Sequence, residues 1–191
     1  MQSAEESDED LMRLVSARDA AAFARLVDRH LARVHGLARR LLGRPADAED
    51  VVQDVMAKLW TAPEAWSASK GNFPNWLSRV TSNACIDRLR RRRPDTGLDE
   101  VMTMTADEAA PDPFDKAFDT QRANRIEQAL ERLPERQKLA IVLFHFQGHS
   151  GAEVARIMDI KLAAMESLLA RARRKLKADL ADDLQALLTD N

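Results

Sequence analysis

The sequence has 191 residues, of which 45% are hydrophobic and 31% charged, and its formal net charge at pH 7 is −2. This length fits one ordinary domain or two small ones, and the composition is that of a folded globular chain rather than a disordered one. The single cysteine, Cys85, excludes an internal disulfide and a zinc site built on cysteines. No apolar run approaches the ~18 residues of a membrane span, and the acidic start, Met1 to Asp10, lacks the basic residues of a secretory signal. We therefore expect a reducing, cytoplasmic location.

The first half of the chain predicts three helices. Apolar residues recur every three or four positions over 23–41, as in a helix with one buried face. A second helix is predicted over 47–60, with Asp47 as its N-cap. A third is predicted from Asn75 into a block of arginines before Pro94. Its inward residues are predicted to be Trp76, Leu77, Val80 and Ala84.

The middle of the chain has a different chemistry. Residues 94–119 carry eight acids against one base and include Pro111 and Pro113. This composition predicts a flexible acidic linker over 94–121, although a structured loop packed on a domain fits it too. Helical patterns resume over 122–191. Because no segment alternates with the two-residue period of a half-buried strand, we expect an all-α fold with two small helical domains, 1–93 and 122–191.

Residues 150–176 have the spacing of a helix-turn-helix. Ser150 and Glu153 form a capping box that begins the first helix, and Asp159 stands at the sharp turn, where a left-handed residue is needed. Residues 161–177 carry six cations against Glu166, a local charge of +5. Such a helix suits a phosphate backbone, but an ordinary helical hairpin with a solvated basic face has the same pattern.

Two further surfaces are suggested in the first half. Arg79, Asn83, Ile86 and Arg90 share one face of the predicted helix 75–93, and arginine and asparagine can bind base edges; a solvated surface is the alternative. The predicted helix 47–60 carries a strip of acidic and polar residues that would repel DNA and could contact a basic protein surface. The residues of this strip are Glu49, Asp50, Gln53 and Asp54.

Taken together, four segments resemble a bacterial sigma factor of the extracytoplasmic-function (ECF) group. Residues 47–60, DAEDVVQDVMAKLW, are similar to region 2.2, and residues 71–93, GNFPNWLSRVTSNACIDRLRRRR, to regions 2.3 and 2.4. Residues 133–160, LPERQKLAIVLFHFQGHSGAEVARIMDI, are similar to region 4.1 and the start of the helix-turn-helix, and ESLLARARRKL (166–176) to the end of the recognition helix. The resemblance extends from about residue 21 to residue 180.

The resemblance implies a promoter-reading function and assigns residues to it. The first domain would bind the β′ clamp helices of core RNA polymerase and melt the −10 element, and the second would read the −35 element, with helix 135–146 at the β flap. The residues implied for the −10 element are Trp66, Arg79, Asn83, Ile86, Arg88, Arg90, Arg91, Arg92 and Arg93. Those implied for the −35 element are Lys161, Ser167, Arg171, Arg174 and Lys175. Those implied for core polymerase are Asp50, Gln53 and Asp54. Trp66 and the loop 67–75 match the family's loop that holds a flipped-out base.

The sequence departs from the family pattern at the turn and in the recognition helix. Asp159 stands where glycine is usual, Glu166 where lysine is frequent, and Leu168 where arginine is frequent. A carboxylate in the major groove can accept a hydrogen bond from cytosine but repels phosphate. The −35 base contacts of the family therefore cannot all be transferred to this chain.

The resemblance also implies a cognate anti-sigma factor, through which the chain could be held at a membrane. Two other classes of protein fit parts of the sequence: a one-component regulator that binds its operator without polymerase, and a sigma mimic that titrates an anti-sigma factor. The basic run before Pro94 favours a DNA-binding role over a mimic. We expect no enzymatic activity, cofactor or metal, because the histidines lack metal or triad spacing with carboxylates and Cys85 is predicted to be packed rather than catalytic.

Overall fold

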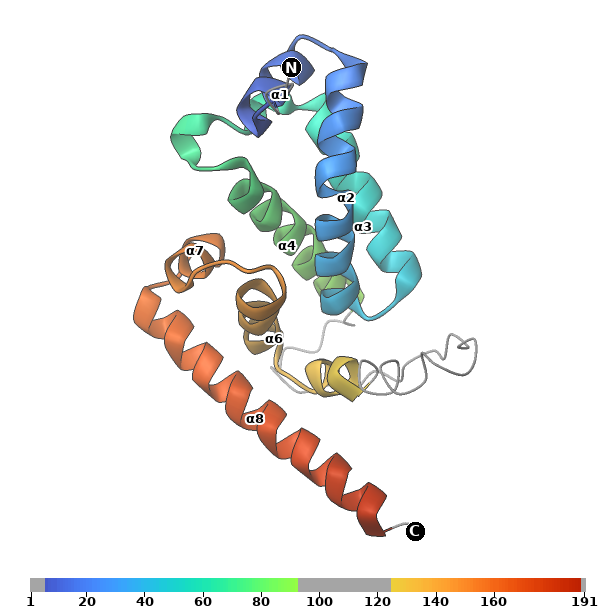
Figure 1. Ribbon diagram of the computed structural model, residues 1–191, viewed down its shortest axis with the longest axis vertical. Coiled ribbons are helices and arrows are strands. Elements are labelled where there is room, and N and C mark those ends of the chain that lie inside the picture. Colours follow the sequence, from blue (N-terminus) through green and yellow to red (C-terminus); the bar gives the residue numbers. More distant parts are fainter. Residues whose placement is uncertain (1–5, 93–124, 190–191) are drawn as a thin grey trace, which may run out of the picture.

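The computed structural model describes residues 6–92 and 125–189, apart from the side chains of Lys70 and of residues 182–189. Every regular element in these residues is a helix, which confirms the predicted all-α class. The first domain contains α1 (Asp8–Ser16), α2 (Ala20–Leu42), α3 (Pro45–Thr61), the 3₁₀ turns η1 (Pro63–Ala65) and η2 (Ala68–Lys70), and α4 (Phe73–Arg92). The second contains a helical stretch at 125–131, then α6 (Glu135–Ile141), η3 (Val142–Phe146), α7 (Gly151–Ile157) and α8 (Leu162–Thr189) (Figure 1). The predicted linker over 94–121 lies outside the described residues.

The first domain is built on α2, which packs against α1, α3 and α4. The helix α1 was not predicted from the sequence, yet Leu11, Met12 and Val15 are among the most deeply buried residues of the chain. Its signal was present, because Ser7 and Asp10 form a capping box directly before this apolar group. The acidic N-terminal segment therefore leads into a helix whose apolar residues belong to the core.

The predicted bounds and faces of the first three helices need corrections. Arg44, not Asp47, is the N-cap of α3, because Pro45 occupies the first helical position, where its missing N–H costs nothing. Leu31 lies on α2 but is 41% exposed. The helix α4 begins at Phe73 rather than Asn75, and its predicted inward residues other than Leu77 are only half-buried. The residues buried along α4 are Phe73, Leu77, Ser78, Thr81, Ser82 and Cys85. Three of these are hydroxyl residues, which an apolar pattern cannot identify.

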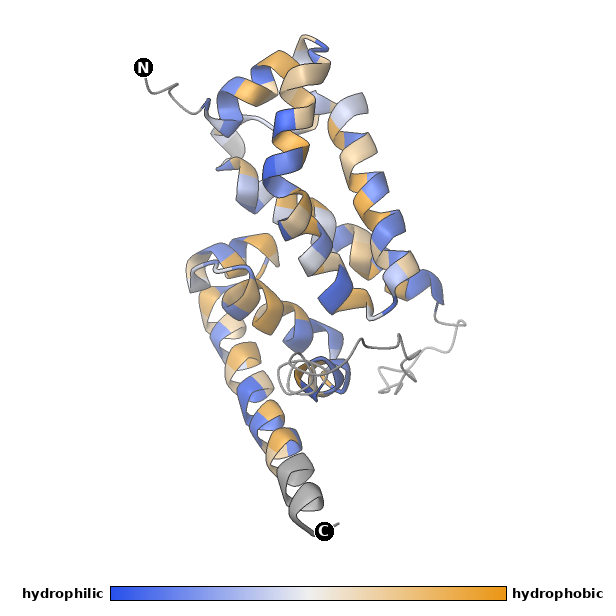
Figure 2. Cartoon of the chain, turned by 45° about the vertical axis from the view of Figure 1, so that its right-hand side comes forward, coloured by the Kyte–Doolittle hydropathy of each residue, from blue (hydrophilic) through white to orange (hydrophobic). Residues whose placement is uncertain are grey.

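The structure of the second domain confirms the predicted helix-turn-helix. Ser150 caps α7 and Glu153 completes the capping box. Asp159 has φ = 52°, the left-handed conformation that its place in the turn requires. The predicted helix 135–146 is not uniform, because its second part, η3, is a π-helical turn. The helix α8 extends well beyond α6 and α7 (Figure 1). Both hydrophobic and hydrophilic residues are found along it (Figure 2).

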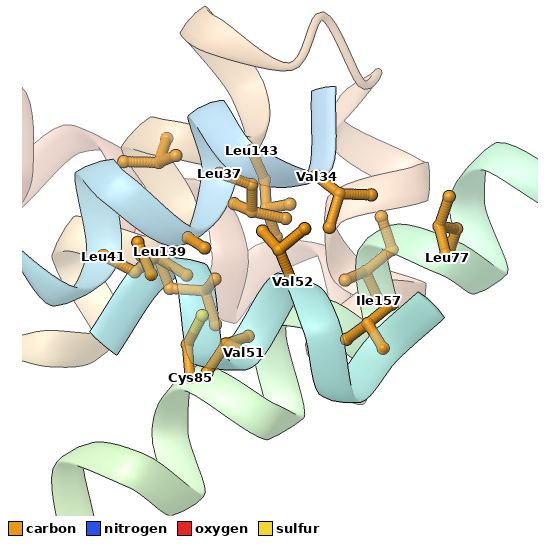
Figure 3. Packing of buried hydrophobic residues seen from close by; sticks show 14 of the residues in the cluster. Val34, Leu37, Leu41, Val51, Val52, Leu77, Cys85, Leu139, Leu143 and Ile157 are labelled. Atoms are coloured by element: carbon orange, nitrogen blue, oxygen red, sulfur yellow. The ribbon is translucent and has the colours of Figure 1, made fainter. Parts of the chain in front are cut away.

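The two domains are in direct contact and share one apolar cluster. Leu139 of α6 and Leu143 of η3 are buried together with Leu37 and Leu41 of α2 (Figure 3). Elements of the two domains meet along α2 and η3 and along α4 and α7. Because α4 faces α7, the predicted −10 helix has the second domain as a neighbour.

Candidate nucleic-acid interface

One face of α4 carries polar side chains that are exposed to solvent. Arg79, Asn83 and Arg90 are exposed and Ile86 is half-buried, while Leu77 on another side of the helix is buried. The helical period brings these four residues to one side, as the sequence predicted. This face therefore offers guanidinium and amide groups for base or phosphate contacts.

A cavity of about 330 Å³ lies beside this face, between the two domains. The first domain contributes Asn75, Arg79 and Asn83 to its wall, and the second contributes Glu153 and Arg156. The cavity therefore places charged and amide groups of both domains around the N-terminal half of α4. The carboxylate of Glu153, on α7, therefore shares this cavity with Arg79 and Asn83 of the predicted −10 face.

Trp66, which the resemblance places at the flipped base, is buried. Its indole Nε1 donates a hydrogen bond to the carbonyl oxygen of Gly71 at 3.2 Å. Its ring meets that of Phe73 edge-on, with 5.6 Å between centroids. In this structure Trp66 thus holds the shape of the loop 67–75 from inside and does not line the cavity.

Glu153 connects the helix-turn-helix to the start of α4. The Asn75 side-chain amide donates to Glu153 Oε1 at 2.9 Å, while the Ser150 backbone N–H and hydroxyl both donate to Oε2 at 2.8 Å. The hydrogen bond from Asn75, together with those from Ser150, lowers the pKa of Glu153 to about 2. The carboxylate therefore remains ionised at every pH at which the protein would be studied.

A second polar contact joins the loop 147–149 to the first domain. The Arg33 guanidinium donates from Nε to the side-chain oxygen of Gln147 at 3.1 Å and from Nη2 to the Gln147 carbonyl at 2.7 Å. The Ser78 hydroxyl lies 2.9 Å from Nε2 of the buried His149, and Arg33 Nη2 lies 3.3 Å from the same nitrogen. Burial and then the nearby Arg33 lower the pKa of His149. Sequence reasoning missed this cluster, because no local pattern relates residues more than seventy positions apart.

The acidic strip on α3 and the arginines of α4 meet at one corner of the first domain. Arg88 donates from Nε to Asp47 Oδ1 at 3.0 Å and reaches Asp50 Oδ2 through Nη2 at 2.5 Å. Arg92 pairs with the other oxygen of Asp47. Two of the predicted phosphate contacts are therefore occupied by carboxylates within the chain, and Asp50 is not a free side chain.

Other residues predicted for the −10 element and for core polymerase are exposed. Arg90 and Arg91 are exposed on α4, and Gln53 and Asp54 are exposed on α3. Arg93 lies outside the described residues.

The predicted −35 residues lie on the outer side of α8 and before its start. Lys161, Ser167, Arg171, Arg174 and Lys175 are all exposed. Arg171 Nη2 donates to the Ser167 hydroxyl at 2.8 Å.

A cavity of about 330 Å³ is lined by Gln137 of α6 together with Arg171, Arg174 and Lys175 of α8. Arg173 instead turns to η3, where it donates to Nε2 of His145. Of the two residues that depart from the family pattern, Glu166 is exposed and Leu168 half-buried.

Comparison with known proteins decides the family. Residues 26–94 match the family model of sigma-70 region 2, and residues 123–176 match sigma-70 region 4. The ECF RNA polymerase sigma factor SigM of Mycobacterium tuberculosis (strain ATCC 25618 / H37Rv) is 33% identical over 174 residues, which cover 90% of this chain and 84% of SigM. The chain belongs to the sigma-70 family, in its ECF group. The sigma factor SigW of Bacillus subtilis (strain 168) is 29% identical over 88% of this chain and 94% of its own.

Solved structures agree with this assignment. This sigma factor superposes on CnrH, solved in complex with the cytosolic domain of CnrY, with a TM-score of 0.71 and 26% identity over 93% of this chain and 99% of CnrH. It shares its fold with the sigma factor RpoE of Bartonella quintana, solved with the anti-sigma factor NepR, at a TM-score of 0.63 and 23% identity over 83% of this chain and 96% of RpoE. Sigma factors are transcription initiation factors and not enzymes.

The structure also places the single cysteine of this sigma factor. Cys85 is fully buried on α4, and burial raises the pKa of its thiol to about 12, so the thiolate that would react is suppressed. Within residues 6–92 and 125–189, no group of three or more histidine, cysteine or acidic side chains could hold a metal ion. No helix in the same part of the chain has the length and apolarity to cross a bilayer.

Proposed function

We propose that this sigma factor binds core RNA polymerase through the first domain and directs it to promoters, with α4 at the −10 element and α8 at the −35 element. The observation that carries the proposal is the separation of charge on three helices. An exposed acidic and polar strip lies on α3, and exposed basic faces lie on α4 and α8. The first can contact a basic protein surface, and the other two can contact DNA.

For the −10 element, the exposed face of α4 supplies the contacts. Asn83 is the best base reader, because its amide can donate and accept at a base edge. Arg79 and Arg90 lie on the same side of the helix, where they can stack on bases or bind phosphate. Extruding a base from the duplex costs a few kcal/mol, so melting is driven by the binding energy of these contacts and needs no covalent chemistry.

For the −35 element, the exposed cations of α8 supply the phosphate contacts. Arg171, Arg174 and Lys175 line one hollow with Gln137, and Lys161 is exposed directly before the helix begins. Ser167 lies on the exposed side of the same helix. We assign the −35 contacts to these exposed residues.

For core polymerase, Gln53 and Asp54 are exposed on α3 next to Asp50. We assign these three residues to the β′ clamp helices and the segment 135–146 to the β flap. We place the domain boundaries at 1–93 and 122–191, with 94–121 as the linker, in agreement with the spans of the two matched family models.

An anti-sigma factor is the second proposed partner. RpoE of Bartonella quintana was solved with an anti-sigma factor, and CnrH with the cytosolic domain of CnrY. In this chain the two domains touch through Arg33, Ser78 and Asn75, so a partner that stabilises the contact would keep α4 beside α7. We propose that such a partner holds the sigma factor in the cytoplasm, directly or at the membrane.

The test is reconstitution with core bacterial RNA polymerase followed by sequencing of the transcripts that start on genomic DNA. We expect the protein to co-elute with core and to direct starts that share −35 and −10 sequences. Asp54→Lys should lose co-elution, while Glu9→Lys, an equal charge change at an exposed position of α1, should keep it. Failure of the unmodified protein to join core would overturn the proposal, and binding to duplex DNA without polymerase would indicate a one-component regulator instead.

A further inference from the structure

The arginine block at the end of α4 is divided by the helical period into two sets. Arg88 and Arg92 are four residues apart and therefore lie on the same face of the helix. That face meets the first turn of α3, where Asp47 receives both arginines, one on each carboxylate oxygen. Arg90 lies on the opposite side of the helix, Arg91 lies at the edge of the shared face, and both are exposed.

Burial separates the same two sets. Asp47 is only 9% exposed, and the side chain of Arg92 is 19% exposed. Burial, together with the nearby Arg44, lowers the pKa of Arg92. A carboxylate held this far from water requires its partners, because removing one leaves a buried charge uncompensated. Asp47 and Asp50 also balance the charges of Arg88 and Arg92, so this corner contributes little net positive charge for DNA.

The Arg88 guanidinium bridges two carboxylates, Asp47 and Asp50. Arg88 reaches Asp47 Oδ1 through Nε at 3.0 Å and through Nη2 at 2.9 Å, and Nη2 also reaches Asp50 at 2.5 Å. A guanidinium can bridge two carboxylates in this way, whereas a lysine ammonium cannot reproduce the planar arrangement.

We propose that Arg88 and Arg92 are positioning residues that act through Asp47, and that the phosphate contacts of this block belong to Arg90 and Arg91. The inference rests on the proposed function, since it divides the arginines of the −10 helix by role. Through Asp47 the end of α4 is held to the start of α3. Because Asp50 belongs to the proposed polymerase-binding strip, the same corner sets the −10 reading face at a defined place relative to core polymerase.

The experiment combines thermal unfolding of the full chain with salt-dependent binding of the reconstituted holoenzyme to a promoter fragment mapped in the transcription assay. Each phosphate contact contributes about −0.9 to the slope of log K against log salt concentration. Arg90→Gln should make the slope shallower by about 0.9 and leave the unfolding midpoint unchanged. Arg88→Gln should leave the slope unchanged and lower the midpoint by about 4 °C or more.

A conservative variant keeps the test informative if Arg88→Gln does not fold. Arg88→Lys retains the charge and should also leave the salt slope unchanged, but it should not restore the unfolding midpoint if the guanidinium bridge to Asp47 and Asp50 is what matters. Asp47→Asn should lower the midpoint, and adding Arg88→Gln to it should lower it little further, because the two changes remove the same interaction.

A shallower slope with an unchanged midpoint for Arg88→Gln would overturn the inference. If holoenzyme with the unmodified sigma factor does not bind the promoter fragment, the proposed function fails. The unfolding measurements still decide whether Asp47 and Arg88 are coupled.

Discussion

The two basic helices, α4 and α8, carry similar charge in very different surroundings. Residues 79–93 hold six arginines against Asp87, and residues 161–177 hold six cations against Glu166, so both have a local charge of +5. Within the described residues, α4 packs against α2, α3 and α7, and two of its arginines form ion pairs. No ion pair in the same part of the chain involves a cation of α8.

This difference shows that local charge alone does not measure DNA-binding capacity. On α4 the arginines are divided between the fold and the ligand, so a substitution there changes stability at some positions and binding at others. On α8 the outer charge belongs to the surface, so a substitution there should change binding alone. The net charge of −2 does not show these two basic helices, because acids elsewhere in the chain offset their charge.

The largest expected effect tests how deeply α4 is embedded. Leu77 of α4 is 2% exposed and belongs to the apolar cluster that includes Ile157 of α7 (Figure 3). Leu77→Ala should lower the free energy of unfolding by about 2–5 kcal/mol, because it leaves a cavity in a packed core. Leu162→Ala, at the 47% exposed first residue of α8, should change it by less than about 0.5 kcal/mol. Urea denaturation measures both, and equal effects would contradict the contrast between the helices.

A smaller effect is expected on the outer side of α8. Arg174→Glu should weaken binding of the holoenzyme to a promoter with an intact −35 element by about tenfold or more, because it removes a charged hydrogen bond to phosphate. Its unfolding midpoint should be unchanged, since Arg174 forms no ion pair with another described residue. Lys58→Glu on α3 is the matched charge reversal. In a footprinting or mobility-shift assay, unchanged affinity for Arg174→Glu would remove this residue from the −35 surface.

What the sequence predicted correctly depends on local signals. The capping box of Ser150 and Glu153 and the left-handed Asp159 follow from residues that are neighbours in the chain. The exposed placement of Arg79 and Asn83 follows from the period of a helix. These features depend on residues within one or two helical turns of each other. The four motifs in their order were sufficient to indicate the family.

What the sequence did not predict depends on contacts across the fold. The arginine block before Pro94 reads as one basic patch, yet Asp47, more than forty residues earlier, binds Arg88 and Arg92. The buried side of α4 includes Ser78 and Thr81, whose polarity conceals their burial. Trp66 has a residue type suited to stacking on a base, but its indole is used inside the loop.

The smallest predicted effect is a pH dependence of the contact between the domains. His149 is buried between Ser78 of α4 and Arg33 of α2, with Glu153 of α7 as the nearby acid. Burial and Arg33 lower the pKa of His149, so an open or unfolded chain binds a proton more readily than the closed one. The contact should therefore be fully stable above the ordinary histidine pKa of about 6.5 and weaken as pH falls below it.

This dependence can be assigned to one residue. Glu153, with a pKa of about 2, remains ionised over this range and does not contribute. The glutamine in His149→Gln can still accept the hydrogen bonds from Ser78 and Arg33 but cannot titrate. The variant should therefore show a smaller change in the unfolding midpoint between pH 7.5 and 5.5. The change in the radius of gyration, measured by X-ray scattering over the same range, should also be smaller. His145 titrates in the same direction, because burial and Arg173 lower its pKa. Since His145 is exposed and contacts Arg173 of α8, His145→Gln should leave the increase in radius at low pH intact. An equal loss in both variants would place the switch elsewhere.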